Sequence, residues 1–93
     1  MYKVNEYFGG KVMSLAFQNG SDKATIGVIA KGEYEFGTAT IEFMTVTTGK
    51  MLVMLPGSSN WKEYKAGETY KIEKDQKFKV KVEEDTAYLC VYK

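Results

Sequence analysis

The sequence predicts an all-β fold, either a barrel or a sandwich of two antiparallel sheets. Turn-forming residues recur about every eight to twelve residues along the 93-residue chain. The segments between these turns alternate apolar and polar residues with a period of two, which is the strand period. No segment sustains the 3.6-residue period of a helix over about eleven residues. About nine short strands in a chain of this length bury their apolar faces best by closing or stacking sheets.

The first half of the chain contains four of the expected strands. Residues 11–18 alternate, and the Asn19-Gly20 pair predicts a hairpin connection to a second strand at residues 24–30. Residues 33–36 alternate carboxylates with aromatic rings, so the two kinds of side chain lie on opposite faces. A fourth strand is expected at residues 42–47, before a tight turn.

The second half contains five more expected strands. Residues 77–82 show the clearest alternation, with lysines on one face and apolar side chains on the other. Residues 88–92 are apolar on both faces and indicate a more fully buried strand. The remaining strands are bounded by glycine, proline or charged turns and lie at residues 51–55, 61–64 and 69–72.

Composition predicts one globular domain spanning residues 1–93. Hydrophobic residues make up 44% and charged residues 27% of the chain, which is ordinary for a globular protein. No apolar run approaches the roughly 20 residues that cross a bilayer, so no membrane association is expected. The net charge of +1 gives no broad field to attract nucleic acid. A single cysteine, Cys90, forbids an intrachain disulfide and favours a cytoplasmic location.

Two residue types are absent, and their absence restricts the chemistry. The chain has no histidine, so a Cys/His zinc site and the Ser-His-Asp and Cys-His forms of nucleophilic catalysis are excluded. It also has no arginine, since all thirteen basic residues are lysines. An anion site must therefore use lysine ammonium groups, hydroxyls or backbone N–H groups. We expect no metal and no cofactor.

The most informative polar group is Glu42. If the alternation that begins at Tyr34 continues through Thr38 and Thr40, then Glu42 and Met44 also point inward. An inward carboxylate beside two inward hydroxyls has no evident packing purpose in a small barrel. Such a group could hydrogen-bond sugar hydroxyls or form a buried structural network, and the sequence leaves both open.

Other candidates have simpler interpretations. Glu33 and Glu35 could serve as a carboxylate pair, but their alternation with aromatics places them on a solvent face. The lysines at residues 77–81 could follow a phosphate backbone, yet charged lysines also protect an exposed strand from pairing. Trp61 could stack on a base, but a lone tryptophan in a small β domain more often packs at the rim of the core. Cys90 lies among apolar residues and is interpreted as a small buried hydrophobe.

Two spacings in the chain resemble the cupin motifs, although the metal-binding residues differ. Thr38, Thr40 and Phe78 stand where metal-binding cupins carry histidines, so the metal chemistry of cupins is not expected here. The resemblance implies a cupin-like β-barrel of the antiparallel double-sheet, jelly-roll type. The residues that carry the spacing of the first motif are Gly32, Thr38, Thr40, Glu42 and Gly49, and the second runs from Gly67 to Phe78.

A closer resemblance covers residues 5–92. The chain resembles the small cupin-type pyrimidine/purine nucleoside phosphorylases, which implies a cytosolic homodimer. The implied reaction, a pentosyl (glycosyl) transfer, uses inorganic phosphate to split a nucleoside into free base and ribose 1-phosphate. The matching pieces are Asn5-Glu6-Tyr7-Phe8, Gly10-Lys11-Val12, Gly32-Glu33-Tyr34 with Phe36, Thr38-Ala39, Met44-Thr45-Val46 with Gly49, Leu55-Pro56, Trp61, Ala66-Gly67 and Tyr88-Leu89-Cys90 with Tyr92.

The resemblance leads to a hypothesis for the site inside the barrel. Glu42 would hydrogen-bond ribose hydroxyls or offset the charge that develops on the sugar, and Thr38 and Thr40 would offer hydroxyls to phosphate or sugar. The substrate-binding residues would be Tyr34, Phe36, Met44 and Phe78, with the three aromatic rings forming the wall around the base. The alternative is a non-catalytic cupin-like module that binds a nucleoside, sugar or small anion.

Overall fold

The computed structural model describes residues 2–93 and confirms the predicted all-β architecture. Its strands form a six-stranded sheet in the order β1-β2-β3-β10-β5-β8 and a four-stranded sheet in the order β4-β9-β6-β7, all antiparallel. A short 3-10 helix, Phe8–Gly10, follows the first strand. The strands are β1 Val4–Tyr7, β2 Val12–Asn19, β3 Asp22–Ile29, β4 Gly32–Gly37, β5 Glu42–Thr48, β6 Lys50–Met54, β7 Lys62–Lys65, β8 Thr69–Ile72, β9 Lys77–Val82 and β10 Thr86–Tyr92.

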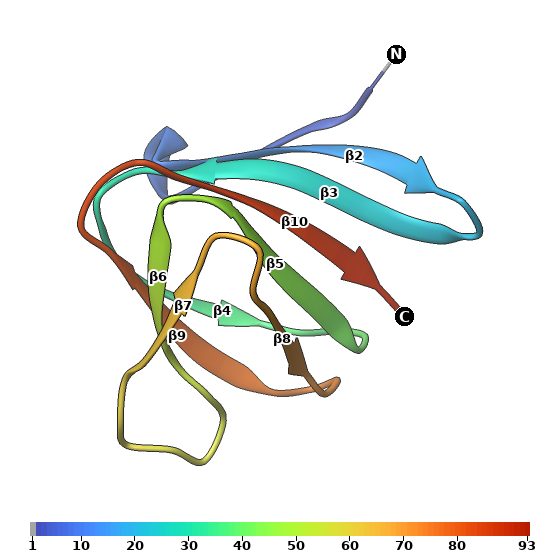
Figure 1. Cartoon of the computed structure of the whole chain (residues 1–93). Helices are drawn as coiled ribbons and strands as arrows, with labels where there is room; N and C mark the ends of the chain where they lie inside the picture. The colour runs from blue at the N-terminus through green and yellow to red at the C-terminus, as the bar shows by residue number, and fades with distance from the viewer. Residues whose placement is uncertain (1) are drawn as a thin grey trace.

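The two sheets face each other and enclose the hydrophobic core (Figure 1). Alternation along each strand directs every second side chain between the sheets, where it is removed from water. Because each sheet supplies part of one cluster, the core joins both layers. Its most buried members are Val12, Ile29, Val46, Met51, Val53, Ile72, Val80 and Val82.

The nine predicted strands are all present, with ends within two residues of those expected. The strand missed is β1, an edge strand whose side chains are mostly exposed, so it shows no core-facing alternation. The expected continuous alternation from Tyr34 to Met44 is wrong. Strand β4 ends at Gly37 and β5 begins at Glu42 in the other sheet, so residues 38–41 are a loop that crosses between layers.

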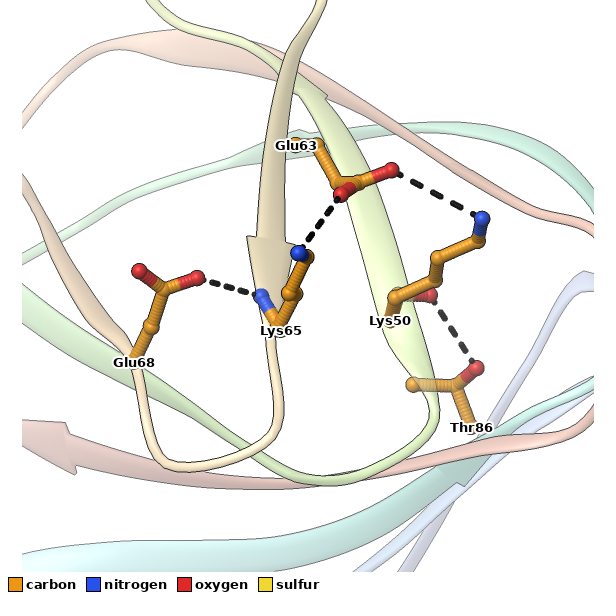
Figure 2. Close-up of polar contacts among 5 residues, drawn as sticks. All are labelled: Lys50, Glu63, Lys65, Glu68 and Thr86. Carbon is orange, nitrogen blue, oxygen red and sulfur yellow. Dashed lines mark hydrogen bonds and ion pairs between the residues drawn. The ribbon is translucent and has the colours of Figure 1, made fainter.

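Polar contacts gather around β6 and β7 at one end of the barrel (Figure 2). The buried Thr86 hydroxyl lies 3.0 Å from the Glu84 carbonyl oxygen and 3.4 Å from the Lys50 carbonyl oxygen, and its one proton can be donated to either. Glu63 lies 3.6 Å from the Lys50 ammonium, and a Glu68 carboxylate oxygen accepts the Lys65 backbone N–H at 2.6 Å. Thr86 begins β10, so these contacts lie at the end of the barrel opposite the end of β10 at Tyr92.

The opposite end of the barrel is open. The β2–β3 hairpin projects beyond the other strands on the side where the C-terminus lies (Figure 1). Strand β10 ends here at Tyr92, and β5 begins here at Glu42, its antiparallel partner. This end therefore gathers a hairpin tip, a chain end and the loop at residues 38–41. No helix among residues 2–93 is long and apolar enough to cross a membrane.

The outer face of the six-stranded sheet is unusually apolar for a surface. A shallow hollow of about 410 Å³ lies on it, lined almost entirely by apolar side chains. Exposed hydrophobic side chains on this face are Val4, Met13, Leu15, Ile26 and Val28, from β1, β2 and β3. The hollow has no charged lining and therefore offers no groups for catalysis.

Candidate active site

The register of the six-stranded sheet places three polar side chains in one row at the open end. Lys23 on β3 lies opposite Tyr92 on β10, and Tyr92 lies opposite Glu42 on β5. Residues directly opposite one another in antiparallel strands point to the same face. The row therefore presents an ammonium, a phenol and a carboxylate side by side toward the space between the sheets.

The next row inward is less polar. Thr25 lies opposite Cys90, which lies opposite Met44, and all three side chains are buried. The Thr25 hydroxyl and the Tyr92 hydroxyl are 3.0 Å apart and hydrogen-bonded. Tyr92 is thus fixed in position by a neighbour in the row below it.

An inner cavity of about 240 Å³ lies between the two sheets. Glu42 is the single charged group in its lining, and half of its lining residues are aromatic or methionine. A cavity of this kind suits a planar apolar ring with a few polar groups at its edge. Its main lining side chains are Tyr7, Ser14, Phe36, Glu42, Met44, Phe78, Tyr88, Cys90 and Tyr92.

An outer cavity of about 530 Å³ opens at the rim of the barrel. Its lining surface is mostly apolar but includes two lysines, Lys3 and Lys23, that the inner cavity lacks, and Glu42, Tyr92 and Ala39 line both. The two cavities therefore meet at Glu42, and a ligand could extend from one to the other past its carboxylate. The polar residues of the outer lining are Lys3, Asn5, Lys23, Thr25, Thr40, Glu42 and Tyr92.

Glu42 lies in a partly desolvated position. Burial raises the pKa of its carboxyl above the ordinary value of 4.5, and a hydrogen bond from the Cys90 thiol opposes that shift. The thiol donates to Oε1 at 3.4 Å, and no other hydrogen bond or ion pair to this carboxylate is found within residues 2–93. Glu42 thus retains acceptor capacity for a ligand at the junction of the cavities.

Three further titratable groups of the inner cavity, Tyr88, Tyr92 and Cys90, stay neutral near pH 7. Burial raises the pKa of Tyr88 to about 12 and raises the pKa of Tyr92 and of Cys90 well above their ordinary values. Neutral phenols can donate hydrogen bonds, and a neutral thiol is a poor nucleophile. The prediction that Cys90 is a small buried hydrophobe is therefore confirmed.

Gly27 makes room for Tyr88. A Cβ atom at position 27 would lie 2.6 Å from the Tyr88 hydroxyl oxygen and 2.8 Å from the Met13 carbonyl oxygen, both too close for any larger residue. The glycine thus lets the tyrosine ring lie against β3 while it lines the inner cavity. Sequence reasoning missed this pair, because a glycine within a strand signals a close approach without identifying the partner.

The structure brings four of the predicted site residues together: Glu42, Phe36, Met44 and Phe78 all line the inner cavity. Tyr34 lies elsewhere. Its hydroxyl donates to the Ala30 carbonyl oxygen at 2.7 Å, and its ring packs beside Phe36 in the core. The expectation that Tyr34 forms part of the wall is wrong, since it is absent from the lining of both cavities.

The expectation that the hydroxyls of Thr38 and Thr40 point into the barrel beside Glu42 is also wrong. Thr38 is buried, and its hydroxyl donates to the Glu73 carbonyl oxygen at 2.7 Å and accepts the Gln76 N–H at 3.0 Å. Thr40 is exposed and lines only the outer cavity. The strand period does not apply to these residues because they belong to the loop between β4 and β5.

Several lining residues were not predicted. Tyr7 belongs to the missed strand β1, and Lys3 directly precedes that strand. Lys23 lies on β3, whose pairing partners the sequence does not identify. The signal that could have found Tyr88 and Tyr92 is their alternation in β10, which places both on the face of Cys90. Among residues 2–93, no three His, Cys, Asp or Glu side chains gather as metal ligands would.

Comparison with known sequences identifies close relatives. A family model described as pyrimidine/purine nucleoside phosphorylase matches residues 2–92. A protein of Alcanivorax borkumensis named pyrimidine/purine nucleoside phosphorylase is 62% identical over 92 residues, which cover 99% of this chain and 98% of that protein. The match extends over both sheets and both cavities.

Comparison with solved structures agrees. A protein of unknown function from Vibrio parahaemolyticus has a TM-score of 0.96 at 40% identity, covering 100% of this chain and 99% of that chain. An RmlC-like cupin from Shewanella frigidimarina has a TM-score of 0.77 at 17% identity, covering 98% of this chain and 82% of that chain. The second likeness shows the fold alone, and it confirms the predicted cupin-like barrel.

Proposed function

Since the chain belongs to the pyrimidine/purine nucleoside phosphorylase family, we propose that it cleaves purine and pyrimidine nucleosides with inorganic phosphate. In this pentosyl transfer the C1′–N bond breaks, and its electron pair leaves with the base, which takes up a proton. A phosphate oxygen forms the new C1′–O bond, giving free base and ribose 1-phosphate. The observation that carries the proposal is the meeting at Glu42 of an inner cavity rich in aromatic side chains and an outer cavity that carries two lysines.

The proposed arrangement places the base in the inner cavity. Phe36, Met44 and Phe78 supply apolar and aromatic surface on which a planar ring can stack. Recognition by stacking does not distinguish strongly among bases, because it makes few hydrogen bonds to the base edge. This lining supports action on both purine and pyrimidine nucleosides.

The ribose would then lie at the junction of the cavities, beside Glu42. A carboxylate there can accept hydrogen bonds from ribose hydroxyls and stabilise the positive charge that develops as the C1′–N bond breaks. The partly desolvated position of Glu42 strengthens both effects, since charges interact more strongly away from water.

The two threonines take different roles in this proposal. Thr40 contributes its hydroxyl at the rim of the outer cavity, where sugar or phosphate would enter. Thr38 acts as a positioning residue, because its hydroxyl ties the loop at residues 38–41 to the turn between β8 and β9. That loop carries Ala39 and Thr40, which line the outer cavity.

We also propose that the enzyme is a homodimer in the cytoplasm. The apolar outer face of β1, β2 and β3 supports a second copy as the occupant, because Ile26 and Val28 are exposed at its centre. Exposed apolar patches of this kind mark interfaces, and a self-complementary face forms a two-fold dimer. The buried, unpaired Cys90 is compatible with a reducing compartment.

Phosphorolysis by the purified protein tests the proposal directly. Uridine, cytidine, inosine, adenosine and guanosine would each be incubated with and without phosphate, and free base and ribose 1-phosphate would be followed. Base release that depends on phosphate is the expected result. Saturable nucleoside binding without release would instead support a non-catalytic binding module, which shares the same cavities.

A further inference from the structure

A phosphate site in this chain must be built without arginine, the residue that most often binds phosphate in a bidentate manner. It contains no arginine and no histidine, so the charge of a phosphate must be met by lysine. Of the thirteen lysines, two line the cavities that meet at Glu42, and both lie in the outer one: Lys3 and Lys23. Lysine is an established phosphate ligand that acts as a point charge.

Both ammonium groups are electrostatically available. Neither Lys3 nor Lys23 forms an ion pair within residues 2–93. The acidic residue next to Lys23 in the chain, Asp22, is already paired with Lys93 at 2.6 Å. The positive charge on this side of the outer cavity is therefore uncompensated and would attract an anion.

The sheet register places Lys23 on the same face of the sheet as Glu42. Lys23, Tyr92 and Glu42 form one row across three strands, so Lys23 and Glu42 stand about 10 Å apart at the backbone, on opposite sides of Tyr92. An anion held by Lys23 is thus kept apart from the Glu42 carboxylate while it faces the junction. Lys3 alternates with Asn5, a second lining residue of the outer cavity, and reaches the same space.

The outer cavity also contains a hydroxyl group that can donate a hydrogen bond to an anion. The Tyr92 and Thr25 hydroxyls share one hydrogen bond at 3.0 Å, so only one of their two protons is used in it. The other proton is free to be donated to an anionic oxygen in the outer cavity, which both residues line.

We propose that Lys23 and Lys3, with the Tyr92–Thr25 hydroxyl pair, form the phosphate subsite of this enzyme in the outer cavity. The inference rests on the proposed function and extends it by assigning the groups that hold the second substrate. Phosphate bound here approaches the ribose from the side away from the inner cavity. The incoming oxygen and the departing base then lie on opposite sides of C1′.

The test is a kinetic comparison of lysine variants. Lys23→Gln should raise the KM for phosphate roughly tenfold or more, because a charged hydrogen bond is lost, while the KM for uridine stays within about twofold. Lys3→Gln should act in the same direction, and Lys23→Arg should restore much of the phosphate affinity, since it keeps the charge. Lys31→Gln is the matched control, an exposed lysine just beyond the opposite end of β3.

Direct binding separates this inference from the proposed function. Calorimetric titration of inorganic phosphate into wild type and Lys23→Gln needs no turnover, and the variant should bind at least about tenfold more weakly. Unchanged phosphate KM and unchanged phosphate binding in both Lys23→Gln and Lys3→Gln would overturn the subsite. Absence of phosphorolysis by the wild type, with phosphate binding that still depends on Lys23, would reject the proposed function alone.

Discussion

Glu42 is the one acidic side chain that lines both cavities, and its removal is the most direct test at the scale of a single residue. Glu42→Gln keeps the shape and loses the charge. We expect kcat to fall at least about tenfold, or roughly 1.4 kcal/mol of barrier. Steady-state phosphorolysis of uridine measures the change, and circular dichroism checks that the fold is kept.

The matched control for this variant is Glu35→Gln. Glu35 lies on the exposed face of β4, as its alternation with aromatic residues predicts, so its loss should not alter kcat. Equal kinetics for wild type and Glu42→Gln would remove Glu42 from the proposed mechanism.

The pKa of Glu42 makes a second prediction at this scale. Burial raises it above 4.5, so the folded protein holds this proton more tightly than the unfolded chain. The resulting contribution to stability is present below pH 4.5 and is lost as the pH rises through the raised pKa. Wild type should therefore lose stability relative to Glu42→Gln over that window.

Activity should rise with pH over the window in which stability falls, because the proposed role of Glu42 uses the ionised carboxylate. The acid limb of the pH profile of kcat/KM should lie above the ordinary glutamate range and should be absent in Glu42→Gln. Urea unfolding from pH 4 to pH 8 measures the stability difference. A constant difference across that range would show that the pKa of Glu42 is unshifted.

At the scale of elements, the regular strands were predictable and the connections were not. Residues 69–72 and 77–82 were expected at the bounds observed for β8 and β9, because alternation and flanking turns define them. The inward orientation expected of Thr38 and Thr40 was wrong, because it carried the strand alternation through residues 38–41, which form a loop. Which sheet each strand joins depends on contacts distant in sequence, which the local pattern does not encode.

The same limit explains how much of the site could be predicted. Glu42, Met44 and Phe78 were found because their own strands direct them inward. Lys23 and Tyr92 were missed because only the pairing of β3 with β10 brings them side by side. The two residues are 69 positions apart in the sequence.

The corrected loop yields a prediction that compares two threonines. Thr38→Val removes a buried hydroxyl that bonds the Glu73 carbonyl oxygen and the Gln76 N–H, and both backbone groups lose this partner. It should lower the free energy of unfolding by about 1–3 kcal/mol. Thr40→Val, at an exposed position, should change it by less than about 0.5 kcal/mol.

Urea denaturation of the two variants provides the measurement. We expect Thr38→Val to have a lower free energy of unfolding than Thr40→Val. A Thr38→Val protein as stable as wild type would mean that the hydroxyl does not anchor the loop. Kinetics add a second comparison. Thr40→Val should weaken substrate binding through the outer cavity that its side chain lines.

At the scale of the whole molecule, one hydrophobic cluster draws on both sheets. This supports the proposal that residues 1–93 fold as one domain, because neither sheet has a separate core. A chain of about 90 residues buries only about 60–65% of its unfolded surface, so its core is small. Burial of further apolar surface in a dimer interface would therefore add to its stability. The apolar outer face of β1, β2 and β3 can remove further apolar surface from water by pairing with a second copy.

Ile26 tests this pairing because it lies near the middle of that face. It is 45% exposed, and its strand neighbours on the same face are Leu15 and Leu89. Ile26→Lys would bring an ammonium from each copy into an apolar interface, where an unpaired charge is costly. We expect the wild type to be a dimer and Ile26→Lys to be a monomer by light scattering with size-exclusion chromatography.

The control is Glu33→Lys, an exposed strand position on the outer face of the other sheet, which should stay dimeric. A dimeric Ile26→Lys would place the interface elsewhere, and a monomeric wild type would reject the homodimer itself. The kinetics of a monomeric variant also address the site. Ile26→Lys should keep phosphorolysis if the dimer serves stability alone.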